Sequence, residues 1–162
     1  MNPMIIVQEA DFDSAALLAR LRGQVGAEAG AIATFTGYVR DFAPDQATET
    51  LFLEHYPGMC ERELHEIADT ARQRWQLAGT VIAHRVGALP RGAQIVFVAA
   101  ASAHRGDAFR GCEYMIDALK TRAPFWKCET LSGGRSFWVE QREADHQRTQ
   151  SWDAGDTPKE PT

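Results

Sequence analysis

The stretch AQIVFVAAAS, residues 93–102, determines the fold that we expect for this chain. Apolar residues occupy both alternating sets of positions, so a strand formed here would be buried on both faces. Such a strand belongs in the centre of a covered sheet. From Asp107 onward, apolar residues recur at helical spacing, and the helix must stop before Pro124 because the residue preceding a proline disfavours helical geometry. The segment therefore predicts a central strand followed by a helix that packs on its sheet.

Segments on either side of this unit carry further strand and helix patterns. Asp13 or Ser14 can cap a first helix, and two runs around Gly133 and Gly134 have the pattern of a β-hairpin. Strands at 30–40 and 47–56 are expected to form an antiparallel pair across the polar loop DFAPDQ. The remaining predictions are strands at 5–8 and 80–87 and a helix within 57–75. Because strands and helices mix without strict alternation, the predicted class is α+β.

The length and composition indicate one domain. The chain has 162 residues, of which 44% are hydrophobic, which suffices for a single core. We place this domain at residues 1–143. Residues 144–162 are polar, and we expect them to form a disordered C-terminal tail.

Charge and cysteine content exclude several classes of protein. A formal net charge of −5 provides no global positive field, so we expect neither nucleic acid nor an anionic membrane as a partner. The chain lacks a signal-peptide pattern and a long apolar run, which predicts a cytoplasmic protein. Three widely spaced cysteines, Cys60, Cys112 and Cys128, predict reduced thiols and no disulfide framework.

Two lysines flank a proline and an aromatic pair in LKTRAPFWKCE, residues 119–129. Lys120 falls in the last turn of the predicted helix, where a solvated charge that favours the helix dipole is the usual finding. Lys127 follows Phe125 and Trp126, and apolar neighbours lower the pKa of a lysine. If helix and strand fold back on each other, the two ammonium groups converge and favour anionic substrates.

The turn SAHRGD, residues 102–107, leaves the central strand and enters a helix. Backbone N–H groups at a helix start, together with His104 and Arg105, can bind an anion. The same residues are equally consistent with a solvated surface arginine and a histidine that caps the helix. Arg40, at the end of the strand at 30–40, offers a third cation or a solvated side chain.

Other chemistry-bearing residues form weaker patterns. His65 and Glu66 begin an H-E-x-x-H motif, but Asp69 replaces the second histidine, so we predict no metal site. His55 and His84 each lie in a predicted strand beside apolar residues, and we interpret both as residues of the core or its rim. We also expect strand alternation to direct Cys128 away from the face that carries Lys127, into a buried position.

Five motifs together resemble the MoaE family, the large catalytic subunit of molybdopterin synthase. They are TFTGYVR (34–40), LEHYPGM (53–59), HRVG (84–87), SAHR (102–105) and LKTRAPFWK (119–127), and the likeness spans about residues 30–143. The resemblance implies an α/β hammerhead-like fold with an additional antiparallel β subdomain, and a homodimer within a heterotetramer. It also implies a small MoaD-like sulfur-carrier partner, whose C-terminal Gly-Gly thiocarboxylate enters a pocket of the large subunit.

The family's activity is a sulfurtransferase reaction of molybdenum cofactor biosynthesis. Sulfur passes from the carrier to cyclic pyranopterin monophosphate, also called precursor Z, and forms the molybdopterin dithiolene, with no metal or other cofactor at this step. By resemblance Lys120 lies beside the thiocarboxyl terminus and Lys127 acts as general acid or base. The substrate-binding positions that the resemblance implies are Tyr38, Val39, Arg40, Cys128, Glu129 and Arg142, with His104 and Arg105 supplied by the neighbouring subunit.

Two departures and two alternatives accompany this resemblance. Tyr38 and Cys128 stand where relatives often carry basic residues, which reduces the expected positive charge of the pocket. A non-catalytic module that recognises a diglycine tail would keep the groove without needing Arg40, His104 and Arg105. A Schiff-base enzyme that uses Lys127 is the third hypothesis.

Overall fold

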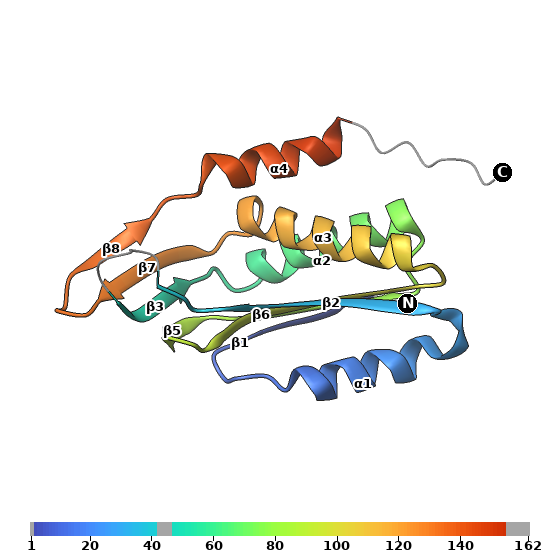
Figure 1. Cartoon of the computed structure of the whole chain (residues 1–162), viewed down its shortest axis with the longest axis horizontal. Helices are drawn as coiled ribbons and strands as arrows, with labels where there is room; N and C mark the ends of the chain where they lie inside the picture. Colours follow the sequence, from blue (N-terminus) through green and yellow to red (C-terminus); the bar gives the residue numbers. More distant parts are fainter. Residues whose placement is uncertain (1, 42–46, 155–162) are drawn as a thin grey trace.

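The computed structural model describes residues 2–41 and 47–154, which form two sheets and their covering helices (Figure 1). Four strands form the first sheet, in the spatial order β1 (Met4–Gln8), β4 (Gly79–Arg85), β6 (Gln94–Ser102) and β2 (Ala31–Tyr38). Four strands form the second, in the order β5 (Gly87–Pro90), β3 (Thr48–Glu54), β7 (Trp126–Leu131) and β8 (Ser136–Val139). The helices are α1 (Ser14–Val25), α2 (Met59–Trp75), α3 (Arg105–Thr121) and α4 (Glu143–Asp153), with a short 3₁₀ turn η1 (Gly26–Glu28) after α1.

Strand β6 is the central strand that its apolar sequence predicts. It pairs antiparallel with β4 on one side and β2 on the other, and the residues from Val98 to Ala101 are fully buried. Val98 and Ala100 pack into the core shared with α2 and α3, whereas Phe97, Ala99 and Ala101 pack toward α1. Both faces of this strand are therefore covered, which explains why its residues 95–101 are all apolar.

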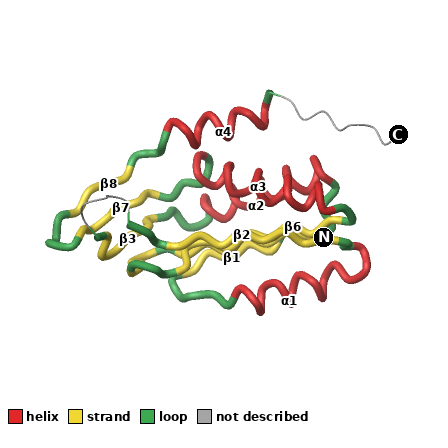
Figure 2. Tube along the Cα trace, viewed as in Figure 1, coloured by secondary structure: helices red, strands yellow, loops and turns green. Residues whose placement is uncertain are grey.

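Helices cover the first sheet in two layers. Figure 2 shows α1 along one face of that sheet and α2 with α3 along the other. The side chain of Asp13 caps α1 by accepting hydrogen bonds from two backbone N–H groups, as the sequence predicts. Within the described ranges, no helix is both long and apolar enough to cross a bilayer.

The second sheet corrects one predicted pairing. The segments at 30–40 and 47–56 do form strands, but they belong to different sheets: β2 pairs with β6, and β3 pairs with β5 and β7. Strand β6 offers β2 an apolar partner from Val96 to Ala101, and this tertiary contact prevails over proximity in the sequence. Most of the loop that we expected between them, residues 42–46, lies outside the described residues.

The hairpin predicted around the glycine pair is present. Strands β7 and β8 pair antiparallel, and Gly133 and Gly134 in their connection have φ of 116° and 85°. Residues with a side chain rarely adopt these values, which accounts for glycine at both positions. Residues 88–90, between the predicted strands at 80–87 and 93–102, contribute most of strand β5.

Helix α4 corrects the predicted tail. Residues 144–153 were expected to be disordered, yet they form a helix that packs on α3 (Figure 1). The Trp152 ring makes edge contacts with Trp75 and Tyr114 at centroid separations of 5.5 and 5.8 Å, and its Nε1–H donates to Asp117 Oδ2 at 2.8 Å. This single indole anchors an otherwise polar helix, so the composition of the segment does not reveal it. Residues 155–162 of the expected tail lie outside the described residues.

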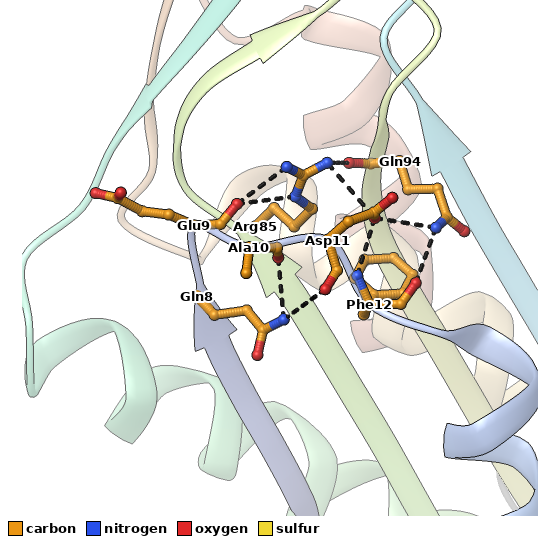
Figure 3. Close-up of polar contacts among 7 residues, drawn as sticks. All are labelled: Gln8, Glu9, Ala10, Asp11, Phe12, Arg85 and Gln94. Carbon is orange, nitrogen blue, oxygen red and sulfur yellow. Dashed lines mark hydrogen bonds and ion pairs between the residues drawn. The ribbon is translucent and has the colours of Figure 1, made fainter.

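A network around Arg85 ties the ends of three strands together (Figure 3). The Arg85 guanidinium donates to the Glu9 carbonyl at 3.0 and 3.1 Å and to the Gln94 carbonyl at 3.2 Å, and it lies 3.5 Å from the Asp11 carboxylate. Gln94 in turn donates to Asp11 and to the Phe12 carbonyl, each at 3.0 Å. The network fixes the end of β4, immediately after His84.

Replacing Trp152 with alanine tests whether α4 belongs to the folded unit. We expect Trp152→Ala to reduce the free energy of unfolding by about 1–3 kcal/mol, less than for a fully buried tryptophan, and to expose α4 amides to hydrogen exchange. Urea denaturation and exchange measured by mass spectrometry would check this. The exposed neighbour Gln150, changed to alanine, is the control, and equal effects of the two substitutions would contradict the anchoring role.

Candidate functional site

A cavity of about 490 Å³ lies where the two sheets, α3 and the start of α4 meet. Four cationic side chains line it, from β7, from the last turn of α3, and from the segments that follow β2 and β8. They are Lys127, Lys120, Arg40 and Arg142. Flat rings from Phe35, Tyr38, His84 and Phe125 form part of the wall. The cavity therefore combines positive charge with aromatic surface.

The two lysines, which the sequence allows to converge, line the same cavity. Lys120 lies in the last turn of α3, the chain reverses at Pro124, and β7 brings Lys127 back to the same cavity. In β7, Lys127 stands opposite Leu53 of β3 and Val139 of β8. Lys120 is exposed, whereas Lys127 is partly buried, so the pair places one ammonium group near solvent and one deeper.

The Lys127 ammonium lies in surroundings that disfavour its charge. Burial lowers the pKa of Lys127 below its ordinary value of 10.5, and the positive charge of Lys120 lowers it further. Arg142 acts in the same direction, and the carboxylate of Asp145 opposes them. A lysine with a lowered pKa can give up and take back a proton more readily near neutral pH.

His84 is a wall residue that the sequence did not identify as part of the site. Its ring stacks on Phe125 at a centroid separation of 3.9 Å and an interplanar angle of 11°, and its Nδ1 lies 2.8 Å from the Arg85 carbonyl. Burial lowers the pKa of His84 to about 4, and the charges of Lys127 and His55 also lower it. Because a carbonyl only accepts, the neutral ring carries its proton on Nδ1 and has an unprotonated Nε2.

Two carboxylates also line the cavity, and sequence analysis missed both. Glu140 is exposed in the connection after β8, and Asp145 is half-buried in the first turn of α4. Asp145 falls within the segment that the sequence predicts to be a disordered tail. The sequence signal that could have placed it at the cavity is Trp152, whose large apolar ring indicates that this segment packs on the domain.

Several predicted binding residues do not line the cavity. Val39 is 2% exposed and packs with Leu51 in a small core, and Glu129 is fully buried and accepts a hydrogen bond from Thr48. Cys128 lies on the opposite face of β7 from Lys127, as expected, but it is only partly buried. None of these three side chains is therefore part of the cavity lining.

His104 and Arg105 lie at the far end of α3. With a rise of about 1.5 Å per residue, Arg105 and Lys120 are separated by about 22 Å along the helix axis. His104 is the N-cap residue of α3, without a side-chain capping hydrogen bond, and both side chains are exposed. One copy of the chain therefore does not bring them to its own cavity.

Two of the cysteines and the histidine–glutamate pair of α2 do not line the cavity. Burial raises the pKa of the Cys112 thiol to about 11 and also raises that of Cys60, so both stay protonated at neutral pH. His65 and Glu66 are exposed on α2. Among residues 2–41 and 47–154, no group of three or more His, Cys, Asp or Glu side chains is placed to hold a metal ion.

Comparison with known proteins identifies the family of this chain. The family described as MoaE protein matches residues 7–122 of this chain. The chain belongs to the MoaE family. A molybdopterin synthase catalytic subunit from Vibrio cholerae is 46% identical over 153 residues, covering 94% of this chain and 100% of the relative. The corresponding subunit from Pseudomonas aeruginosa is 49% identical over 150 residues, covering 92% of this chain and 98% of the relative.

The solved structures of this family confirm the predicted fold class. Molybdopterin cofactor biosynthesis protein E from Burkholderia multivorans superposes with a TM-score of 0.80 at 44% identity, covering 94% of this chain and 98% of that one. The α+β architecture with its second, antiparallel sheet is therefore that of the MoaE family.

The charges around Lys127 predict opposite effects of two substitutions. Lys120→Met removes a repelling cation and should raise the pKa of Lys127, whereas Asp145→Asn removes an attracting anion and should lower it further. The pH dependence of acetic anhydride labelling at Lys127, read by mass spectrometry, measures both shifts. Arg135→Ala, in the exposed turn between β7 and β8, is a charge-removing control. Shifts of the same sign in the two variants would contradict the assigned electrostatics.

Proposed function

We propose that this chain is the catalytic subunit of a molybdopterin synthase, which transfers sulfur from the C-terminal thiocarboxylate of a small ubiquitin-like carrier to cyclic pyranopterin monophosphate. The main support for this proposal is that Lys120 and Lys127 line one cavity in a chain of the MoaE family. The cavity suits a bare peptide terminus, because its cations offset the negative charge of a thiocarboxylate.

The positions of the lysines suggest a division of work. Lys120, exposed at the last turn of α3, attracts the incoming thiocarboxylate, and Lys127 lies deeper, where proton transfer is needed. The thiocarboxylate sulfur attacks an electrophilic carbon of the substrate and forms a thioester, while the C–O bond at that carbon breaks. The oxygen leaves as the opened phosphate ester in one transfer and, after protonation, as water in the other. Water then cleaves the acyl C–S bond, which leaves the sulfur on the pterin and a carboxylate on the carrier. A second carrier repeats the sequence and completes the dithiolene.

Lys127 is suited to the proton steps of this sequence. Sulfur addition and opening of the cyclic phosphate each need a proton delivered or removed, and a lysine with a lowered pKa can serve as acid and then as base. The neutral ring of His84 beside Phe125 adds no competing positive charge to this wall. Sulfur comes from the carrier, so the reaction requires no thiol of this chain, and we assign it no metal or organic cofactor.

The substrate phosphate requires cations, and these favour the catalytic hypothesis over a module that only recognises a diglycine tail. Arg40 and Arg142 line the same cavity as the lysines. We propose that a second copy of the chain adds His104 and Arg105 to this set, because each copy holds them about 22 Å from its own Lys120. The complete site would then lie at a homodimer interface, with one carrier docked on each subunit.

Alanine substitutions of the two lysines test the assigned chemistry. We expect Lys127→Ala to lower turnover by about 100-fold or more, the usual contribution of general acid–base catalysis, and Lys120→Ala to lower it severely by weakening capture of the carrier tail. The assay combines the purified chain, a thiocarboxylated Gly-Gly carrier and precursor Z, with the dithiolene pterin detected by mass spectrometry. Arg135→Ala should be unaffected. Normal turnover by both lysine variants would end the assignment.

Mixing two inactive variants tests the shared site. A His104→Ala, Arg105→Ala double variant and a Lys127→Ala variant should each be inactive alone. After subunit exchange in equal amounts, half of the dimers carry one intact site, so turnover should return to about one quarter of the wild-type level. Analytical ultracentrifugation provides the control for dimer formation. No recovery in a mixture shown to exchange would mean that each site is built from one chain.

A further inference from the structure

The cavity carries negative as well as positive charge, and the proposed anionic ligands account only for the positive part. A phosphate and a thiocarboxylate are both repelled by the carboxylates of Asp145 and Glu140. Besides offsetting the repulsion among the cations, a carboxylate in such a place can accept hydrogen bonds from a donor or attract a cation on the ligand.

Asp145 is held firmly at this position by α4. Its backbone N–H donates to the Arg142 carbonyl at 3.0 Å, and one turn later Thr149 Oγ1 lies within 3.1 Å of the carbonyls of Asp145 and Asp117. The Trp152 indole fixes the far end of the same helix to α3. The carboxylate is thus carried on an anchored element, as a recognition group requires.

The Asp145 carboxylate nevertheless has no partner of its own. Within the described residues, no hydrogen bond and no ion pair engages its side chain, although it lines the same cavity as Lys127 and attracts that ammonium electrostatically. A half-buried carboxylate that is held close to a cation, yet not paired with it, remains free to accept hydrogen bonds from a ligand.

We infer that Asp145 recognises the hydrogen-bond-donating edge of an aminopyrimidinone ring, the edge that a pterin presents through its 2-amino group and the adjacent ring N–H. The inference rests on the proposed function and assigns to Asp145 a specificity-determining role in it. Two neighbouring N–H donors match the two oxygens of a carboxylate, which gives a bidentate, charge-assisted contact.

The rest of the cavity fits the same ligand orientation. The stacked rings of His84 and Phe125 supply a flat wall suited to a bicyclic ring. Arg40, on the segment that follows β2, attracts the phosphate end, and the Asp145 carboxylate on α4 repels it. A ligand with an anionic end and a donor edge is therefore oriented in one direction. Glu140 is the weaker candidate for this role because it is exposed and lies outside α4.

A pair of ligands that differ at one ring position tests the inference. Binding of 6-hydroxymethylpterin phosphate is compared with that of the lumazine analogue, in which a carbonyl replaces the 2-amino group, by following the ring fluorescence on the full-length chain. Wild-type protein should prefer the pterin by tenfold or more, and Asp145→Asn should reduce this ratio by about tenfold. Any change in the Lys127 charge affects both ligands alike, so it cancels in the ratio.

Control variants separate the outcomes. Glu143→Gln removes a charge from the same turn of α4 outside the cavity lining and should leave the ratio unchanged. An unchanged ratio in Asp145→Asn, or a loss found only in Glu140→Gln, overturns the inference while the proposed function stands. If neither ligand binds to the wild-type chain, both the inference and the proposed function are wrong.

Discussion

The burial of β6 on both faces is the constraint on which the rest of the structure depends. An apolar strand of this kind needs a neighbour on each edge and a helical layer on each face, and β4, β2, α1 and the α2–α3 pair provide them. Because α3 follows β6 directly, the packing that covers the strand also fixes the direction of α3 and the place of Lys120 at its end. The position of the reacting group is thus a consequence of core packing.

The site brings together charges that each destabilise the others. Lys120 and Arg142 both lower the pKa of Lys127, and burial acts in the same direction. Folding tolerates this arrangement because Lys120 remains exposed and Asp145 offsets part of the repulsion. An anionic ligand relieves the same repulsion, so the mutual repulsion of these cations favours the binding of an anion.

Local sequence patterns predicted which segments form strands and helices better than they predicted which strands pair with each other. The apolar run of β6, the Asp13 cap and the glycine pair of the hairpin all identified their elements, because each depends on neighbouring residues. The pairing of β2 was wrong, since it depends on the distant strand β6. At the site, the turn at Pro124 indicated that the lysines could meet, and both line one cavity, but nothing local to His84 or Asp145 indicated that they line it too.

The hydrogen bond between Trp152 and Asp117 joins the C-terminal part of α4 to α3, the two helices that carry Asp145 and Lys120. Asp117 is 7% exposed and lies one turn before Lys120, and its Oδ2 accepts the indole N–H. Neither residue can change alone without leaving a poorly matched polar group in the interior. These two positions are therefore expected to covary among related sequences, and a lineage that shortens its C-terminus should also replace the aspartate on α3.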